Sequence, residues 1–539
     1  MSILKKFKNN RIIKRFAALA AAGILAVSLS ACGMTGTGAN SSLNSKQTDT
    51  VAEATVTETV ENAEYSAPSE SSSNYTQINL SDSGSSCSSS YVDIDGDTVT
   101  ITKKGVYELS GSLSDGQIIV DADGAEVELI LNNVSISNDS SAAIYVKQAE
   151  TVYITLEENS VNKLSTTGEY EAIDENDIDA VIFSKDDLII TGSGSLIVDN
   201  DYGHGIVGKD DLTIVSGTYE ITCAEDALSG NDSITVESGS YTINSGDDAI
   251  HSDLDTVING GTINIESCEE GIEGTTVTIN GGDISIKAND DGINAAGDDA
   301  TAETYIAING GNLIVESSGD GIDSNGDLYV NGGYTIVYGP TNDGNGALDY
   351  DSTGQITGGT FIAIGSSGMA MNFSEAEQGT ILVNTGSAYG EGTVIKFTDS
   401  EGNVITELES KKTFSSILVS SPEIASDGSY TLTVGDTQTE ISMEGNIYGS
   451  GMGGFPGGGG FGGQGGFGGG KGGFGGGRDG SGDQNGNPGQ HQHPGNGEMP
   501  EGGFDGQTPP EMPEGGFDGQ TPPEMPDGQM PEGGPGGLR

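Results

Sequence analysis

Asp247-Asp248-Ala249-Ile250 is one copy of an acidic turn that recurs along the middle of the chain. The spacing is 22 residues from Asp226 to Asp248 and again to Glu270, and an insertion lengthens it before Asp320. The other copies are Glu225-Asp226-Ala227-Leu228, Glu269-Glu270-Gly271-Ile272, Asp290-Asp291-Gly292-Ile293 and Gly319-Asp320-Gly321-Ile322. A fixed period of this length is typical of a solenoid, in which successive coils of the chain stack on one another.

Between the acidic turns the chain alternates apolar and polar residues, as in Thr262-Ile263-Asn264-Ile265-Glu266. A period of two is typical of a strand with one buried face, whereas an amphipathic helix requires a period of about 3.6. Several strands begin after an Asn-Gly-Gly segment such as Asn259-Gly260-Gly261. We therefore expect an all-β fold, a right-handed single-stranded parallel β-helix, with the handedness following the general rule for parallel crossovers.

The charge balance restricts the partners of the protein. The chain of 539 residues carries 81 acidic and 20 basic side chains, which gives a formal net charge of −61. Phosphate recognition requires a basic surface, so this balance excludes nucleic acid as a natural partner. The same balance favours cations and keeps the protein soluble outside the cell.

The first 31 residues have the pattern of a bacterial lipoprotein signal peptide. Basic residues precede an apolar stretch from Phe16 to Leu29, and the segment ends in Leu29-Ser30-Ala31-Cys32. This ending resembles a lipobox, in which the cysteine becomes the lipid-modified first residue of the mature chain. We therefore expect residues 1–31 to be removed and Cys32 to anchor the protein at the extracellular face of the cell membrane.

Composition divides the rest of the chain into four segments. Residues 32–89 are rich in Ser, Thr and Glu, and we expect them to form a disordered tether. Residues 90–375 hold the β-helix, and the different rhythm of residues 376–445 predicts a small β cap over the open end of its core. Residues 446–539 form a Gly- and Pro-rich low-complexity tail with too little apolar surface to bury.

The acidic turns supply oxygen atoms that suit a hard cation. Calcium takes six to eight oxygens at ~2.3–2.6 Å from carboxylates, amides, carbonyls and water. A second column of polar residues lies three positions beyond the first and includes Glu273, Asn294 and Asp323. The predicted metal ligands, with calcium as the expected ion, are Asp226, Asp248, Glu270, Glu273, Asp291, Asp320, Asp323, Asp343 and Asp349. Solvated turn residues are the alternative, because Asp-Gly and Asn-Gly form turns readily.

Two cysteines and two histidines also lie within the repeats. Cys223 and Cys268 are about two coils apart, which at ~4.8 Å per strand is too far for a disulfide. We expect both to be buried free thiols. His204 and His251 share the columns of the acidic residues, and we expect them to be histidines on the surface of the turns.

The basic residues indicate whether the protein is an enzyme or a binding protein. Elimination by a lyase requires a base beside the calcium, usually an arginine or a lysine. The β-helix segment contains no arginine, and no basic side chain lies between Lys287 and Lys396. Paired carboxylates such as Asp290-Asp291 suit a hydrolase, but they recur as a structural repeat, whereas a catalytic pair is normally singular. We therefore favour binding and predict no catalytic residues.

Several short motifs recur within residues 90–445. They are Lys185-Asp186-Asp187-Leu188, Lys209-Asp210-Asp211-Leu212, the Asp-Gly-Ile turns, the Asn-Gly-Gly strand starts and Thr413-Phe414-Ser415-Ser416. With these motifs the segment resembles the clostridial carbohydrate-binding family of secreted, pectate-lyase-like β-helix proteins. The resemblance implies a surface protein that binds cellulose or a pectin-like polysaccharide, with calcium and without a need for catalysis. A calcium-dependent pectate-lyase-like enzyme and a structural or adhesive surface protein remain the alternatives.

Four tyrosines are candidates for contact with sugar, because aromatic faces can stack on pyranose rings. Tyr329 and Tyr334 are expected to point outward from the coils, and Tyr338 and Tyr350 lie in nearby turns. The alternative is ordinary exposed tyrosine, which is common in strands.

Overall fold

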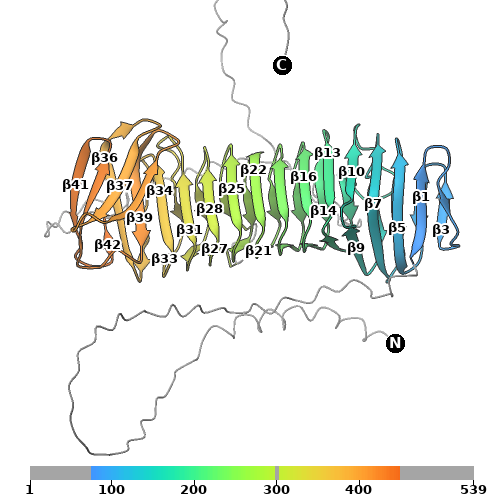
Figure 1. Cartoon of the computed structure of the whole chain (residues 1–539), viewed down its shortest axis with the longest axis horizontal. Coiled ribbons are helices and arrows are strands. Elements are labelled where there is room, and N and C mark those ends of the chain that lie inside the picture. Colours follow the sequence, from blue (N-terminus) through green and yellow to red (C-terminus); the bar gives the residue numbers. More distant parts are fainter. Residues whose placement is uncertain (1–74, 298–302, 450–539) are drawn as a thin grey trace, which may run out of the picture. The chain divides into compact units, whose positions relative to one another are not determined.

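Strands account for all regular structure in the described part of the chain. The computed structural model describes residues 75–297 and 303–449, which contain strands β1 to β42 and no helix. No helix in these residues could therefore cross a membrane. Contacts divide the chain into two units, Met1–Gly459 and Gly460–Arg539, and every described residue lies in the first. The strands form sheets of 26, 12 and 4 strands, and Figure 1 shows most of them side by side in chain order.

Each repeat contributes one short strand to the 12-stranded sheet. Its strands are β3 (Val92–Asp95), β4 (Thr98–Ile101), β6 (Gln117–Asp121), β8 (Ile144–Gln148), β11 (Ala180–Ser184), β14 (His204–Gly208), β17 (Leu228–Gly230), β20 (Ile250–Ser252), β23 (Ile272–Gly274), β26 (Ile293–Ala295), β29 (Ile322–Ser324) and β32 (Asp349–Tyr350). Like residues meet in parallel register, since Ile250 lies between Leu228 and Ile272. An acidic turn directly precedes each strand from β17 to β29, so the turns line one edge of this sheet.

The 26-stranded sheet contains two parallel ladders, and each repeat adds one strand to each ladder. The first ladder consists of β9 (Thr151–Leu156), β12 (Asp187–Gly192), β15 (Asp211–Ile214), β18 (Ser233–Val236), β21 (Asp255–Ile258), β24 (Thr276–Ile279), β27 (Tyr305–Ile308), β30 (Asp327–Val330), β33 (Gly354–Ile356) and β35 (Glu375–Ala376). The second consists of β10 (Val161–Thr166), β13 (Ser195–Asn200), β16 (Thr218–Cys223), β19 (Ser240–Asn244), β22 (Thr262–Cys268), β25 (Asp283–Ala288), β28 (Asn312–Glu316), β31 (Tyr334–Tyr338) and β34 (Thr360–Gly365). The long strand β7 (Glu126–Asn138) pairs with both β9 and β10, and β5 (Gly105–Leu113) pairs with β7.

Inward-facing residues form a continuous apolar core, as the alternation of residues predicts. In β22, Ile263 and Ile265 are buried while Thr262 and Glu266 are exposed. The rings of Tyr219 and Tyr241, from adjacent strands, stack with their centroids 4.9 Å apart. Removal of this apolar surface from water is the main stabilising term of the fold. The expectation of buried free thiols at Cys223 and Cys268 is confirmed.

The Asn-Gly-Gly segments join neighbouring repeats side by side. The side-chain amide of Asn280 donates to Asn259, and that of Asn309 donates to Asn280, at 2.7 and 2.8 Å. The second glycine of each segment lies beneath this ladder. Gly311 has a φ of +84°, and a Cβ there would lie 2.6 Å from the carbonyl oxygen of Gly282. Glycine is therefore required both by the backbone conformation and by the close approach of the next repeat.

Pairing changes from parallel to antiparallel after β34. Strand β39 (Phe414–Ser421) pairs antiparallel with β34 and with β36 (Gly379–Tyr389), and β42 (Ile447–Tyr448) pairs with β36. The four-stranded sheet consists of β38 (Val404–Glu409), β37 (Val394–Asp399), β40 (Ser429–Val434) and β41 (Thr437–Ser442). Its apolar side chains pack on the outward face of β31 and β34 in a second core that includes Tyr338, Ile364, Phe397 and Phe414.

At the other end, the expected tether 32–89 is too long. Strand β1 (Thr76–Ser81) pairs in parallel with β5, and β2 (Ser86–Cys87) pairs with β1. Ile78 and Leu80 alternate with polar residues and are buried in the core, which is why this segment is part of the sheet. The predicted lipidation site Cys32 and the tail beyond residue 449 lie outside the described residues.

Candidate metal-binding site

The acidic turns are joined by hydrogen bonds from each repeat to the next. The backbone N–H of Asp248 donates to Oδ1 of Asp226 at 3.1 Å, and the N–H of Asp320 donates to Oδ1 of Asp291 at 2.5 Å. The N–H of Gly346 donates to Asp320 in the same way. One oxygen of each of these carboxylates therefore holds the following turn in place, and the other is left for a different contact.

The second polar column lies on the short strands beside these turns. In strand register Asn294 lies between Glu273 and Asp323, and Asp323 lies next to Asp349. Among the described residues, four groups bring ligand atoms of His, Asp or Glu within 4.8 Å of one another. They are Asp226 with Asp248 and His251, Asp248 with Glu270 and Glu273, Asp291 with Asp320 and Asp323, and Asp187 with Asp210 and Asp211.

Eight of the nine predicted ligands therefore belong to one row along this edge, and seven of them lie within the four groups. Asp349 extends the row by its register with Asp323 and accepts the N–H of Tyr350. Asp343 does not join the row, since its carboxylate accepts the hydroxyl of Ser366 near the C-terminal strands. The fourth group was missed, although the repeated Lys-Asp-Asp-Leu motif of residues 185–188 and 209–212 contains all three of its members.

The two histidines lie inside the row, and the expectation of surface histidines is wrong. Nδ1 of His204 and Nδ1 of His251 each lie 3.3 Å from Oδ2 of Asp226, and Nε2 of His204 lies 2.8 Å from Glu225. Both residues lie on strands, β14 and β20, and both side chains are partly buried. Burial alone lowers the pKa of His251, but its hydrogen bond to Asp226 and the nearby carboxylates outweigh this effect and raise the pKa to about 9. The histidines therefore provide positive charge at the first end of the row.

His251 also faces the next repeat, since its nitrogens lie 3.8 Å from Asp248 and 3.6 Å from Glu273. Burial raises the pKa of Asp248, and the neighbouring Glu273, Asp226 and Glu270 raise it further. Burial, with the nearby acidic groups, also raises the pKa of Asp291 to about 8 and that of Asp323 to about 7. By contrast, burial of Asp226 is outweighed by its hydrogen bonds with His204 and His251, which hold the pKa of that carboxyl well below its usual range. The two histidines thus oppose the acidic charge at the first end of the row.

The hydrogen bonds of Asn294 indicate whether the carboxylates around it suit a cation. Its side chain is 9% exposed, and its Nδ2 donates to Oε2 of Glu270 at 3.0 Å. Its Oδ1 is buried without a hydrogen-bond partner, although its register neighbours Glu273 and Asp323 carry carboxylates. A buried amide oxygen without a donor is costly, and among carboxylates it is a suitable ligand for a hard cation. These residues therefore fit a metal ion.

The four tyrosines do not form one platform. Tyr334 is exposed, and Tyr329 is partly exposed and donates its hydroxyl to Asp327 at 3.0 Å. Tyr338 is buried in the second core, and Tyr350 is buried with its hydroxyl on the carbonyl of Asn372 at 2.7 Å. Tyr338 is thus covered in the second core and Tyr350 in the main core, so the prediction that these two rings contact sugar is corrected.

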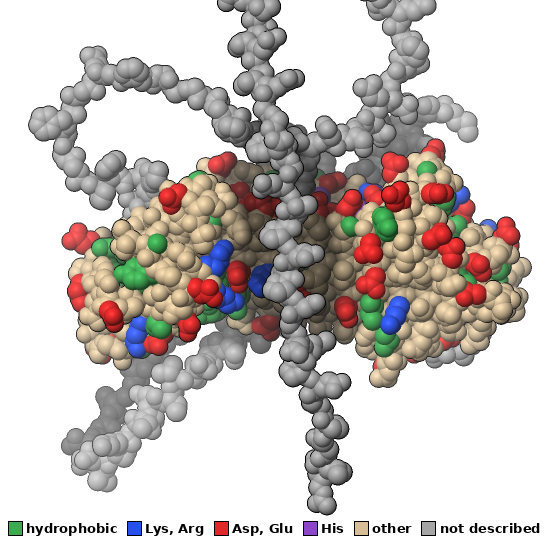
Figure 2. Space-filling view, turned by 90° about the horizontal axis from the view of Figure 1, so that it is seen from above, with side chains coloured by type: hydrophobic (Ala, Val, Ile, Leu, Met, Phe, Trp, Pro, Cys, Tyr) green, Lys and Arg blue, Asp and Glu red, His purple; other side chains and the backbone are tan. Residues whose placement is uncertain are grey.

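Acidic side chains outnumber basic ones on the surface. Figure 2 shows Asp and Glu scattered over one face, with fewer Lys side chains among them. The fold and the site together define an all-β protein of parallel sheets with a row of carboxylates along one sheet edge. Sequence comparison assigns the family.

The family model of carbohydrate-binding domain-containing proteins matches residues 95–257 and 247–445. The chain belongs to this family. A carbohydrate-binding domain-containing protein of Acetivibrio thermocellus is 46% identical over 96 residues, which cover 17% of this chain and 33% of that protein. The chain thus spans about a third of the length of the curated relative it matches. The gadolinium derivative of a polysaccharide lyase-like protein from C. thermocellum is 27% identical, with a TM-score of 0.36, and the match covers 52% of this chain and 97% of that one.

Proposed function

We propose that the protein binds polysaccharide at the cell surface and holds calcium ions along its row of acidic turns. Membership of the carbohydrate-binding family, over most of the described residues, is the observation that carries the first part. The row of carboxylates and the unpartnered oxygen of Asn294 support the second. The ligand is a cellulose- or pectin-like polysaccharide.

The proposed fold is a right-handed parallel β-helix of about 22-residue coils within residues 90–375, followed by a β cap within residues 376–445. The parallel register of successive repeats supports it, because each of the three strands of one repeat pairs with its equivalent in the next. In this arrangement every repeat contributes one acidic turn to the same edge. The proposed lipid anchor at Cys32 would hold the scaffold at the outer face of the membrane.

The calcium ligands would be the carboxylates beyond the histidines together with the Asn294 oxygen. The members are Glu270, Glu273, Asn294, Asp291, Asp320, Asp323 and Asp349. Calcium, when bound, supplies positive charge that relieves the repulsion among these groups and attracts acidic sugars. The protein supplies a rigid row, because the hydrogen bonds of the turns fix one oxygen of each of Asp291 and Asp320.

The test is retention of the full chain on insoluble cellulose and on immobilised pectin, with calcium or with a chelator. We expect retention on at least one glycan, and calcium should strengthen it. Absorbance of the supernatant would reveal unsaturated sugar products if the protein were instead a lyase. Absence of retention on both materials under both conditions would remove the proposal.

A further inference from the structure

A groove of about 480 Å³ lies where the outward face of the parallel strands meets a loop of the C-terminal strands. Its wall comes from β22, β25 and β28, and its rim includes Lys411 from the loop between β38 and β39. The side chains that matter here are Asn264, Glu266, Ser285, Lys287, Ile314 and Lys411. The volume falls within the range of ~300–1,000 Å³ that is typical of small-ligand pockets. None of these residues belongs to the row of acidic turns.

The groove marks a change in the outward face of the sheet. One outward column runs in register from Asn264 through Ser285 to Ile314 and then Ile336. The first two are polar and solvent-accessible, whereas Ile336 is buried beneath the C-terminal strands. Ile314 lies at the boundary and remains partly exposed. The floor of the groove therefore offers hydrogen-bonding groups beside one apolar side chain.

A β-bulge lies beside this groove. Ile265 pairs with Ile286, but Cys268 pairs with Ala288, so Glu266 and Ser267 together lie opposite Lys287. The register between β19 and β22 also shifts at this place. Bulges re-aim side chains and are common beside functional sites. Asn264 and Glu266 point outward by the alternation of β22, and the bulge adds the exposed Ser267 before the buried Cys268.

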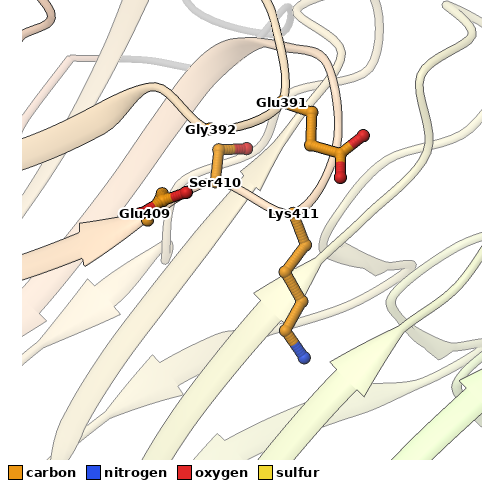
Figure 3. Close-up of a pocket in the computed structure, with 5 residues that line it drawn as sticks. All are labelled: Glu391, Gly392, Glu409, Ser410 and Lys411. Carbon is orange, nitrogen blue, oxygen red and sulfur yellow. The ribbon is translucent and has the colours of Figure 1, made fainter.

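Lys412, the next residue, fixes the loop that carries Lys411 to the wall of the groove. Nζ of Lys412 donates to the carbonyl oxygen of Ser317, a buried residue that directly follows β28. Lys411 is about half exposed, and its Nζ lies 4.0 Å from Glu316 and 5.0 Å from the centroid of the Tyr338 ring. Figure 3 shows the Lys411 side chain extending from the loop toward the neighbouring strands. The ammonium group is thus held over the groove.

We propose that this groove binds a polysaccharide whose sugar units carry carboxylates, with Lys287 and Lys411 contacting the carboxylates of two units. The proposal rests on the proposed function, because it requires that the protein bind polysaccharide. Lys287 and Lys411 balance Glu266 and Glu316 in the lining, so the groove is neutral on a chain with a net charge of −61. Each ammonium group could pair with a carboxylate of the ligand.

The other residues that line the groove suit the hydroxyl groups and the ring of a sugar. Asn264 and Ser285 donate to or accept from hydroxyl groups, and Glu266 accepts from them. Ile314 provides an apolar contact for the C–H face of a sugar ring. The groove lies on the 26-stranded sheet, whereas the acidic turns border the 12-stranded sheet. This contact therefore requires no calcium.

The test measures binding of hexagalacturonate and of neutral cellohexaose to the full chain by calorimetry, with calcium and with EDTA. The variant Lys287→Met/Lys411→Met removes both ammonium groups from exposed positions. The control Lys163→Met/Lys396→Met makes the same charge change on β10 and β37, away from the groove. A third variant, Ser285→Trp, fills the groove without a change of charge. Circular dichroism confirms that each variant is folded.

We expect hexagalacturonate to bind in EDTA, with a loss of about tenfold or more in the groove double variant, as is usual for lost hydrogen bonds to charged groups. Ser285→Trp should show a similar loss, and the control should bind like the parent. Unchanged binding in both groove variants would overturn the groove but leave the proposed function intact. Equal binding of cellohexaose, equally weakened by the double variant, would overturn the acidic-sugar ligand. Failure of the parent chain to bind any glycan would instead remove the proposed function.

Discussion

Oδ2 of Asp226 lies 3.3 Å from Nδ1 of His251, although the two residues are 25 positions apart in the chain. The same carboxylate contacts His204 from the preceding repeat. A single buried acid thus links histidines from two repeats, and its Oδ1 also holds the turn of Asp248. These contacts make Asp226 the most constrained member of the row.

Asp226→Asn should destabilise the protein by about 1.5–3 kcal/mol at pH 7, the usual range for lost hydrogen bonds to charged groups. The amide keeps the shape of the side chain but removes the charge that both histidines face. Urea unfolding followed by circular dichroism measures the change. Asp201→Asn, on an exposed turn, is the matched control and should have little effect. Equal stability of the two variants would show that the histidine contacts contribute nothing.

His251→Gln should reduce stability in a pH-dependent way. The pKa of His251 is raised to about 9 in the fold, so its contribution is fully present below about 6.5 and is lost as the pH rises through about 9. The difference in unfolding free energy between the parent and the variant should therefore shrink from pH 6 to pH 9.5. The measurement is a series of urea titrations in chelator across that range. A difference that grows with pH would contradict the raised pKa.

Without calcium, the carboxylates at the other end of the row should make the fold less stable as pH rises. The pKa values of Asp291 and Asp323 are raised to about 8 and about 7, so their protonated forms favour the fold, and this contribution is lost as the pH rises from about 4 through 8. Calcium requires the ionised forms and should release protons on binding at pH 7. Calorimetry in buffers of different ionisation enthalpy measures this release. If no protons were released, calcium would have to bind away from Asp291 and Asp323.

Asn294→Ala should weaken calcium binding by about tenfold, the effect of losing one favourable ligand oxygen worth ~1.4 kcal/mol. All carboxylates remain, so the variant separates coordination from simple attraction by negative charge. Asn280→Ala, in the exposed asparagine ladder, is the control. Calcium titration of the two variants by calorimetry provides the measurement, and equal affinities would exclude Asn294 as a ligand.

Gly292→Ala should destabilise the protein by about 1–3 kcal/mol, as overpacking usually does. A Cβ at this position would lie 2.2 Å from a methyl group of Val315 and 2.5 Å from the carbonyl oxygen of Gly321. The same displacement would move the adjacent Asp291 and lower calcium affinity. Gly390→Ala is the control, because nothing lies within 4 Å of its added methyl group. Thermal unfolding compares the two.

The sequence is most informative where its pattern repeats. Alternation around Ile263 and the recurring Asn-Gly-Gly segments predict strands, inward columns and parallel stacking, because each is a local consequence of one period. The contacts of His204 and His251 could not be predicted in the same way, because they depend on distances between side chains of neighbouring repeats. The groove beside Lys411 is still harder to predict from the sequence. It forms only because the loop with Lys412 docks on Ser317, which is about 95 positions earlier in the chain.

Equivalent strands of neighbouring repeats pair with one another, as Val236 does with Ile258, and this has an evolutionary consequence. In-frame duplication of one repeat would insert strands whose neighbours on both sides already fit them. The molecule would lengthen by about 4.8 Å, the spacing of paired strands, while both ends kept their contacts. Gene duplication could thus adjust the reach of the protein in small, equal steps.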